Sequence, residues 1–251
     1  MAALNVDDHT AARPAPVFLS AEWRQLAMVN YEVDPAVLRP LVPAGTELDT
    51  FGGRSFVSMV GFLFLRTRVF GFRFPFHTNF EEVNLRFYVR RQVGGAEGWR
   101  RGTVFIKEMV PRWFIATMAK LIYNEPYDTF PMRHRVETAR AGYEWRRGGR
   151  WETLAVESEA GDWQAIAEGS EEEFITEHYW GYNRQRDGRT LEYQVEHPRW
   201  RLRRAREYRF ECDAAGLYGK EFAPFLTGKA SSAFLVEGSA VSVRRGRPVP
   251  V

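Results

Sequence analysis

Lysine is rare in this chain, and one lysine occurs where a charged side chain needs an explanation. The sequence holds 35 lysine and arginine residues in 251, and its only lysines are Lys107, Lys120, Lys220 and Lys229. Lys107 and Glu108 fall inside an apolar run, Thr103–Val110, that is typical of a buried strand. If side chains alternate between the two faces, Lys107 shares a face with Phe105 and Glu108 points to the other.

This charged pair has two interpretations, because lysine and glutamate are rarely buried without a partner. In the first, the run is an edge strand whose charges reach water or pair with neighbouring residues. In the second, the strand belongs to a β-barrel with an internal polar site, where burial shifts pKa values towards catalysis. On the second interpretation, Lys107 and Glu108 are the candidate catalytic residues.

A second polar pattern runs along the segment 80–88. Its even positions hold Glu82, Asn84, Arg86 and Tyr88, and its odd positions hold Val83, Leu85 and Phe87. A strand would place these two sets on opposite faces. The polar face is either an outer surface with cross-strand ion pairs or the inner wall of a barrel that orients a small polar ligand. The second alternative makes Glu82, Asn84 and Arg86 candidate ligand-binding residues.

A third cluster follows a predicted helix start. Ser170 and Glu173 have the spacing of a capping box, and acidic residues suit the first turn of a helix, so this run needs no function. The segment 177–182 that follows is dense in titratable and aromatic side chains. These are either ordinary half-buried aromatics or part of a binding site. On the second alternative, Glu177 and Tyr179 are further candidate ligand-binding residues.

Composition and motifs argue against several other functions. The balance of 35 basic and 32 acidic residues gives no sign of a polyanion partner, and acidic residues interrupt the arginine-rich run 199–209, so no nucleic-acid partner is expected. The 5 histidines lack metal-ligand spacing and no nucleotide-binding motif occurs, so neither a metal nor a cofactor is expected. No run approaches the ~18 apolar residues of a membrane span, and the chain start lacks the pattern of a signal peptide. With Cys212 as the lone cysteine, we expect a cytoplasmic protein with no membrane partner.

The hydrophobic pattern predicts one strand-dominated α+β domain, built as a barrel or sandwich. We expect residues 1–16 to form a flexible N-terminal tail and residues 17–251 a single domain. Predicted helices cover 34–41, 112–122 and 170–176. Predicted strands cover 26–31, 55–64, 83–91, 103–110, 135–146, 151–157, 163–168, 190–196, 200–210 and 233–244. Turn signals at 147–150 and 187–188 separate some of these strands.

Three stretches resemble a known family: Arg-Pro-Leu-Val-Pro at 39–43, Phe-Glu-Glu-Val-Asn-Leu-Arg at 80–86 and Phe-Ile-Thr-Glu-His-Tyr at 174–179. From 18 to 245 the chain is similar to an uncharacterised bacterial family, a domain of unknown function placed in the acetoacetate decarboxylase superfamily. The opening of the domain, Trp23-Arg24 and then 37–43, also resembles the decarboxylases themselves. The resemblance implies a cone-shaped β-barrel whose interior binds small carbonyl or carboxylate compounds.

The resemblance also implies roles for individual residues. The decarboxylases use a Schiff-base lysine, an arginine and acidic residues that orient the substrate. Arg24 falls where that family keeps its site arginine, Glu82 where it keeps one glutamate, and Glu108 resembles a glutamate shortly before the nucleophile. A second site glutamate falls at Val57, and the Pro-Lys-Lys of the nucleophile falls near Pro111-Arg112-Trp113. Arginine cannot lose its proton to become a nucleophile, so the Schiff-base lysine is expected to be lost.

Two functions from different classes remain open. In one, the protein is a non-catalytic small-molecule binder that kept the barrel and the polar residues Arg24 and Glu82. In the other, it is a lyase or hydratase-type enzyme acting on a small oxo acid, with Lys107 as electrophile or base and Arg24 as a carboxylate clamp. We expect Arg24, Glu82 and Arg86 to point inwards, and a buried Glu82 to pair with an arginine. Assembly into a homo-oligomer stays open.

Overall fold

The computed structural model describes residues 15–94, 98–111, 124 and 126–250, and these are dominated by strands with a few short helices. The strands are β1 Val17–Val33, β2 Glu47–Leu48, β3 Ser55–Val69, β4 Phe80–Gln92, β5 Trp99–Val110, β6 Tyr127–Thr129, β7 Met132–Glu137, β8 Arg140–Arg147, β9 Arg150–Ser158, β10 Gln164–Ala165, β11 Trp180–Arg184, β12 Thr190–Glu196, β13 Arg201–Glu211, β14 Ser232–Arg244 and β15 Arg247–Pro248. The helices are α1 Pro35–Leu38, the 3-10 helix η1 Arg39–Leu41, α3 Glu171–Thr176, α4 Ala214–Tyr218 and α5 Ala223–Leu226. The strand-dominated α+β class is therefore confirmed.

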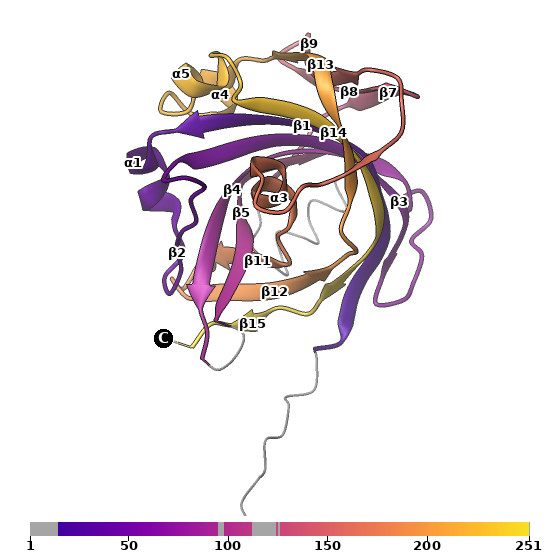
Figure 1. The fold of residues 1–251 in the computed structure, drawn as a ribbon. Helices are drawn as coiled ribbons and strands as arrows, with labels where there is room; N and C mark the ends of the chain where they lie inside the picture. The colour runs from indigo at the N-terminus through magenta and orange to yellow at the C-terminus, as the bar shows by residue number, and fades with distance from the viewer. Residues whose placement is uncertain (1–14, 95–97, 112–123, 125, 251) are drawn as a thin grey trace, which may run out of the picture.

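Seven of the strands close into a ring (Figure 1). Around the ring they follow the order β12, β11, β5, β4, β3, β1 and β14. The ring is completed where β12 pairs with β14, with Val195 opposite Val243 and Glu196 opposite Ser242. All neighbours in the ring are antiparallel except β5 and β11, which run parallel. Closure pairs the sheet edges with one another and leaves an interior for side chains or a ligand.

A second sheet covers one side of the ring and lies above β1 in Figure 1. It leaves the ring at β14 and continues through β13, β9, β8 and β7. Tyr143 and Trp145 of this sheet share one hydrophobic cluster with Met59 and Leu85 from the outer faces of β3 and β4. A glycine allows the close approach, because a Cβ at Gly61 would lie 2.5 Å from Cδ2 of Tyr143. The outer faces of these strands are thus buried in a packed core, which leaves their inner faces for a site.

The described helices are short and begin at side-chain caps where the sequence predicted them. Asp34 Oδ1 accepts a hydrogen bond from the Ala36 amide at 2.8 Å at the start of α1. Ser170 Oγ accepts one from the Glu173 amide at 3.1 Å at the start of α3. The predicted helix at 112–122 lies outside the described residues, and none of the described helices is long and apolar enough to cross a membrane. Helices α4 and α5 were not predicted, because five or fewer residues show no helical period.

Two predicted strands have different boundaries in the structure. The segment 135–146 is not one strand but the hairpin of β7 and β8, which turns between Glu137 and Arg140. This turn could not be predicted, because Thr138 and Ala139 lack the glycine, proline or asparagine typical of tight turns. The predicted strand 163–168 shortens to β10, which pairs with β13. The predicted turn at 147–150 is confirmed, with Gly148 and Gly149 at φ 55° and 82°.

Candidate functional site

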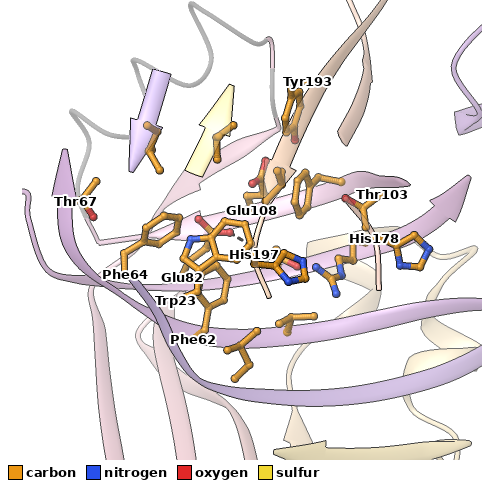
Figure 2. A pocket seen from close by; sticks show the side chains of 18 of the residues that line it. Trp23, Phe62, Phe64, Thr67, Glu82, Thr103, Glu108, His178, Tyr193 and His197 are labelled. Atoms are coloured by element: carbon orange, nitrogen blue, oxygen red, sulfur yellow. Dashed lines mark hydrogen bonds between the residues drawn. The ribbon is translucent and has the colours of Figure 1, made fainter. Parts of the chain in front are cut away.

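The interior of the ring encloses a cavity of about 200 Å³, to which every ring strand contributes side chains. Most of its wall is aromatic or aliphatic. The apolar wall includes Phe18, Trp23, Leu26, Val60, Phe62, Phe64, Phe80, Phe105, Trp180, Tyr193, Val195, Trp200 and Val243. Figure 2 shows that polar side chains, among them Glu82, Glu108 and His197, cluster together inside this apolar enclosure. Such a mixture of an apolar wall and a few convergent polar groups is typical of small-molecule sites.

The even-numbered face of β4 forms one wall of the cavity. Glu82, Asn84 and Arg86 all line it, and their side chains are buried. The odd-numbered residues Val83 and Leu85 point the other way into the core between the two sheets. Strand β4 therefore has its polar face towards the ring interior, because its apolar face is needed against the second sheet.

A β-bulge in β5 decides which of the two neighbouring charges reaches the cavity. Leu85 of β4 is opposite Lys107, but the next residue of β4 is opposite Phe105, so Ile106 is an extra residue in the ladder. The alternation inverts at this point, and Phe105 lines the cavity together with Glu108. The expectation that Lys107 shares a face with Phe105 is wrong, since a period-two pattern cannot foresee a bulge.

Lys107 is engaged away from the cavity lining. Its Nζ donates a hydrogen bond to Oδ2 of Asp128 at 2.7 Å, and the two side chains are 25% and 39% exposed. Glu108, by contrast, is buried and lies opposite Asn84 in the ladder between β4 and β5. The two candidate catalytic residues are therefore not brought together in one site.

Arg24 also lies outside the cavity lining, for a similar reason. The register of β1 against β3 shifts between Arg24 and Ala27, and Gln25 adopts a φ of 57°. Trp23 and Leu26, on either side of this irregularity, line the cavity. Arg24 donates instead to Glu22 Oε2 at 3.1 Å and to the carbonyl of Gly238 at 3.0 Å. Of the three residues expected to point inwards, Glu82 and Arg86 do so and Arg24 does not.

Glu82 has neutral partners rather than the expected arginine. Its Oε1 accepts from Asn84 Nδ2 at 2.9 Å, and its Oε2 accepts from the Tyr127 hydroxyl at 3.0 Å. Burial raises the pKa of this carboxyl to about 7, although both hydrogen bonds and the nearby Arg86 oppose the rise. The cause is desolvation, which disfavours the charged form in an apolar enclosure. Glu82 can therefore hold or release a proton near neutral pH.

Several polar atoms on the cavity wall have no hydrogen-bond partner among the described residues. They include Trp23 Nε1, Thr67 Oγ1, Asn84 Oδ1, Arg86 Nε, and both ring nitrogens of His178. His178 stacks on Tyr88 with ring centroids 4.5 Å apart, and burial holds the pKa of His178 well below its usual value, so the ring is neutral. Buried polar groups in proteins are almost always paired, so a concentration of unpaired ones marks a place for a ligand or water.

Glu177 and Tyr179 lie beside this wall but do not line it. The Tyr179 hydroxyl donates to the Glu177 carboxylate, and the Tyr179 ring stacks on His197 at 4.8 Å. His197 in turn stacks on Trp200 at 4.0 Å and does line the cavity. The sequence marked the right segment but the wrong residues, because nothing local shows that His178 and not its neighbours turns inwards.

Cavity residues that the sequence did not single out include Trp23, Tyr127, His178 and His197. Trp23 was noted only beside Arg24. No local pattern marks them, since they meet through the ring. The described residues contain no group of three His, Cys, Asp or Glu side chains that could hold a metal ion.

Comparison with known proteins places the chain in a family. The profile of DUF2071, described as an uncharacterized conserved protein, matches residues 20–240. The chain belongs to the DUF2071 family. A curated relative, the uncharacterized protein YqjF of Bacillus subtilis strain 168, is 39% identical over 69 residues, which span 27% of this chain and 28% of YqjF. The family assignment confirms the resemblance found in the sequence.

Solved structures share the fold of this DUF2071 protein. Acetoacetate decarboxylase from Legionella pneumophila strain Philadelphia 1 is similar with a TM-score of 0.64 and 14% identity, over 100% of this chain and 98% of that one. The enduracididine biosynthesis enzyme MppR, complexed with pyruvate, has a TM-score of 0.65 and 13% identity over 98% and 95% of the two chains. An acetoacetate decarboxylase-like enzyme from Sphingomonas wittichii RW1 has a TM-score of 0.59 and 14% identity over 98% and 99%. The fold is therefore acetoacetate decarboxylase-like.

Proposed function

We propose that this protein binds a small, largely apolar organic molecule that carries a carbonyl or carboxylate group, and that it does so without forming a Schiff base. The observation that supports this most directly is the cavity itself, an apolar enclosure whose lining includes unpaired polar atoms. Each buried polar atom left unpaired costs ~1–3 kcal/mol. A ligand that satisfies these atoms removes that cost when it binds.

The unpaired atoms define the chemistry of the ligand. Trp23 Nε1 and Arg86 Nε are donors, so they call for an oxygen acceptor. Asn84 Oδ1 is an acceptor and would take a hydroxyl or a bound water. The aromatic remainder of the wall favours an apolar body on the ligand, since burial of apolar surface drives its transfer from water.

Glu82 makes the binding of an anion dependent on protons. With its pKa at about 7, Glu82 is partly neutral at physiological pH, and a neutral carboxyl does not repel a ligand carboxylate. A carboxylate ligand would favour the protonated form further, so its binding should be accompanied by proton uptake. A ketone without a carboxylate should bind with a much weaker dependence on pH.

The position of Lys107 supports a binder over a lyase. Its amine is held by Asp128, outside the cavity lining, so a bound carbonyl carbon would be separated from it by the strand. MppR, a relative in fold alone, is described as complexed with pyruvate. Oxo acids are therefore the first ligands to test, and covalent capture by a lysine is the alternative that the test must detect.

Calorimetric titration with phenylpyruvate and with phenylacetone, which lacks the carboxylate, tests the proposal. We expect both to bind, and Arg86→Gln to weaken phenylpyruvate binding by about tenfold or more, because a charge-assisted hydrogen bond is lost. Arg24→Gln is the matched control and should leave the affinity within about twofold, since this arginine is outside the cavity. Failure of the native protein to bind either compound, or equal losses in both variants, would contradict the proposal.

Borohydride trapping separates binding from Schiff-base chemistry. Phenylpyruvate is added with sodium borohydride, and the intact mass of the native protein is compared with that of Lys107→Ala. We expect no adduct on either protein. An adduct on the native protein that is absent from Lys107→Ala would replace the binder with the lyase-type enzyme.

A further inference from the structure

The loop between β3 and β4 displays phenylalanine side chains to solvent. Phe72 and Phe76 are 71% and 86% exposed, and Phe70 and Phe74 are 56% and 37% exposed. Phe70 and Phe74 also line the cavity. Because they both line the cavity and reach solvent, these two residues mark an opening of the ring interior. The loop therefore has one apolar side on the cavity and another facing outwards.

Hydrogen bonds hold the loop in this shape. The backbones of Val69 and Phe72 bond to each other in both directions at 3.0 Å. The Phe70 amide donates to the Phe18 carbonyl at 2.7 Å, and the two rings pack edge to face at 4.9 Å. Phe70 and Phe76 adopt φ values of 51° and 64°, which bulky residues rarely do. The outward phenylalanines are thus presented by an ordered loop.

The charges of the loop have one sign. No acidic residue occurs from 66 to 80, whereas Arg66, Arg68 and Arg73 are exposed. Arg66 pairs with Glu22, but Arg68 and Arg73 have no ion-pair partner in the part of the chain that the structure describes. Exposed aromatic residues flanked by arginines are the composition of surfaces that enter the interface of an anionic bilayer.

We propose that this loop docks on the surface of an anionic phospholipid bilayer, with Phe72 and Phe76 entering the interface and Arg68 and Arg73 contacting lipid phosphates. A second copy of the chain fits less well, because the symmetric contact would bring arginines together. The inference departs from the expectation that no membrane partner exists, which rested on the lack of an apolar span. Docking at the surface needs no such span.

Docking would place the cavity opening at the bilayer. Phe70 and Phe74 would then lie between the acyl-chain boundary and the apolar cavity wall. An apolar ligand could pass between bilayer and cavity with little exposure to water. The docking inference goes beyond the proposed function and does not depend on it, because the loop can bind lipid whether or not the cavity is occupied.

Flotation with vesicles tests the inference on the full chain without added ligand. We use phosphatidylcholine vesicles with and without one quarter phosphatidylglycerol, at low and high salt. The native protein should float with the anionic vesicles and lose binding as salt rises. The double variant Phe72→Ser/Phe76→Ser should bind about tenfold less, because the interfacial apolar contact is lost. Leu41→Ser, which changes an exposed apolar residue on η1, is the matched control and should bind like the native protein.

Three results would overturn the inference: no flotation of the native protein, equal flotation of the double variant, or equal binding to vesicles without anionic lipid. A native oligomer that the double variant converts to monomers, measured by light scattering, would also overturn it and assign the loop to self-association. Calorimetric binding of phenylpyruvate by the double variant, measured without vesicles, separates the two proposals. If this binding persists while flotation is lost, the cavity function stands independently of docking.

Discussion

Two tryptophans on the two sides of the ring wall show how differently its faces are built. Trp145 lies in the core between the sheets, is 0% exposed, and donates from Nε1 to Glu152 Oε2 at 2.5 Å. Trp23 lines the cavity, and its Nε1 has no hydrogen-bond partner among the described residues. On the packed face, the buried indole donor of Trp145 has an acceptor. On the cavity face, the indole donor of Trp23 has none among the described residues.

The difference follows from what each face meets. The outer faces of β1, β3 and β4 meet the second sheet, whose residues were fixed by the same chain and can provide partners. The inner faces meet a space of about 200 Å³. Unpaired polar atoms in a packed core are costly, so their occurrence here points to a molecule that is not part of the chain. Variants on the packed face should therefore lose mainly stability, and variants on the cavity face should lose mainly ligand affinity.

The largest effect on stability is expected from the packed face. Trp145→Ala should lower the free energy of unfolding by ~3–5 kcal/mol, because it leaves a large cavity in a closed core. It also removes the donor to Glu152, a carboxylate that in addition accepts from the Asp213 amide at 3.1 Å. Urea unfolding followed by circular dichroism measures the change. A loss below about 1 kcal/mol would mean that this core is less tightly packed than its burial indicates.

The next largest effect on stability is expected at Glu82, and the direction of its pH dependence is unusual for a carboxyl group. Its pKa is raised from 4.5 to about 7 in the folded protein, so the folded state holds a proton that the unfolded chain has released. Stability should therefore be highest below pH 4.5 as far as this group is concerned, and should fall as pH rises to about 7. Above that pH the full penalty remains, of order 3 kcal/mol at ~1.4 kcal/mol for each pKa unit.

Glu82→Gln removes this penalty and the pH dependence with it. The variant should be more stable than the native protein above pH 7 and should differ least below pH 4.5. Urea unfolding of both proteins between pH 4 and 8 measures the difference. Glu81→Gln removes a half-buried carboxylate that bonds His134 instead and serves as the control. If the two variants show the same pH profile, Glu82 does not carry the shift.

Trp23→Ala should sharpen the contrast with Trp145→Ala. Because Trp23 borders an open cavity, its loss should cost only ~1–2 kcal/mol of stability. Its effect on ligand binding should be larger, about tenfold for phenylpyruvate, since both an apolar contact and a donor disappear. Calorimetry on Trp23→Ala and on Trp145→Ala at a temperature where both are folded checks this. Equal affinities in the two variants would remove the distinction between the faces.

The smallest effect on stability and on ligand binding is expected for Lys107→Ala. Lys107→Ala breaks a half-exposed ion pair with Asp128, and such pairs contribute ~0–1 kcal/mol. Binding of phenylpyruvate and phenylacetone should not change, because the amine is outside the cavity lining. A large loss of affinity in Lys107→Ala would bring back the interpretation of this lysine as a site residue.

Much of the fold and part of the site could be predicted from the sequence. The alternation along β4 depends only on the period of a strand, so Glu82, Asn84 and Arg86 were correctly assigned to one face. The caps at Asp34 and Ser170 depend on contacts two or three residues away and were also correct. The family was accessible because its motifs are contiguous in the chain.

Ring closure, the bulges and the convergence of the cavity residues were decided only by the tertiary structure. A bulge in β5 turns Glu108 rather than Lys107 towards the cavity, and an irregularity in β1 turns Trp23 inwards and Arg24 outwards. The bulge and the irregularity both depend on the register of each strand against its neighbours. That register is set by pairing between segments that are far apart in the sequence. The residues of a strand determine that its sides differ, but the strands paired with it determine which side each residue takes after a bulge.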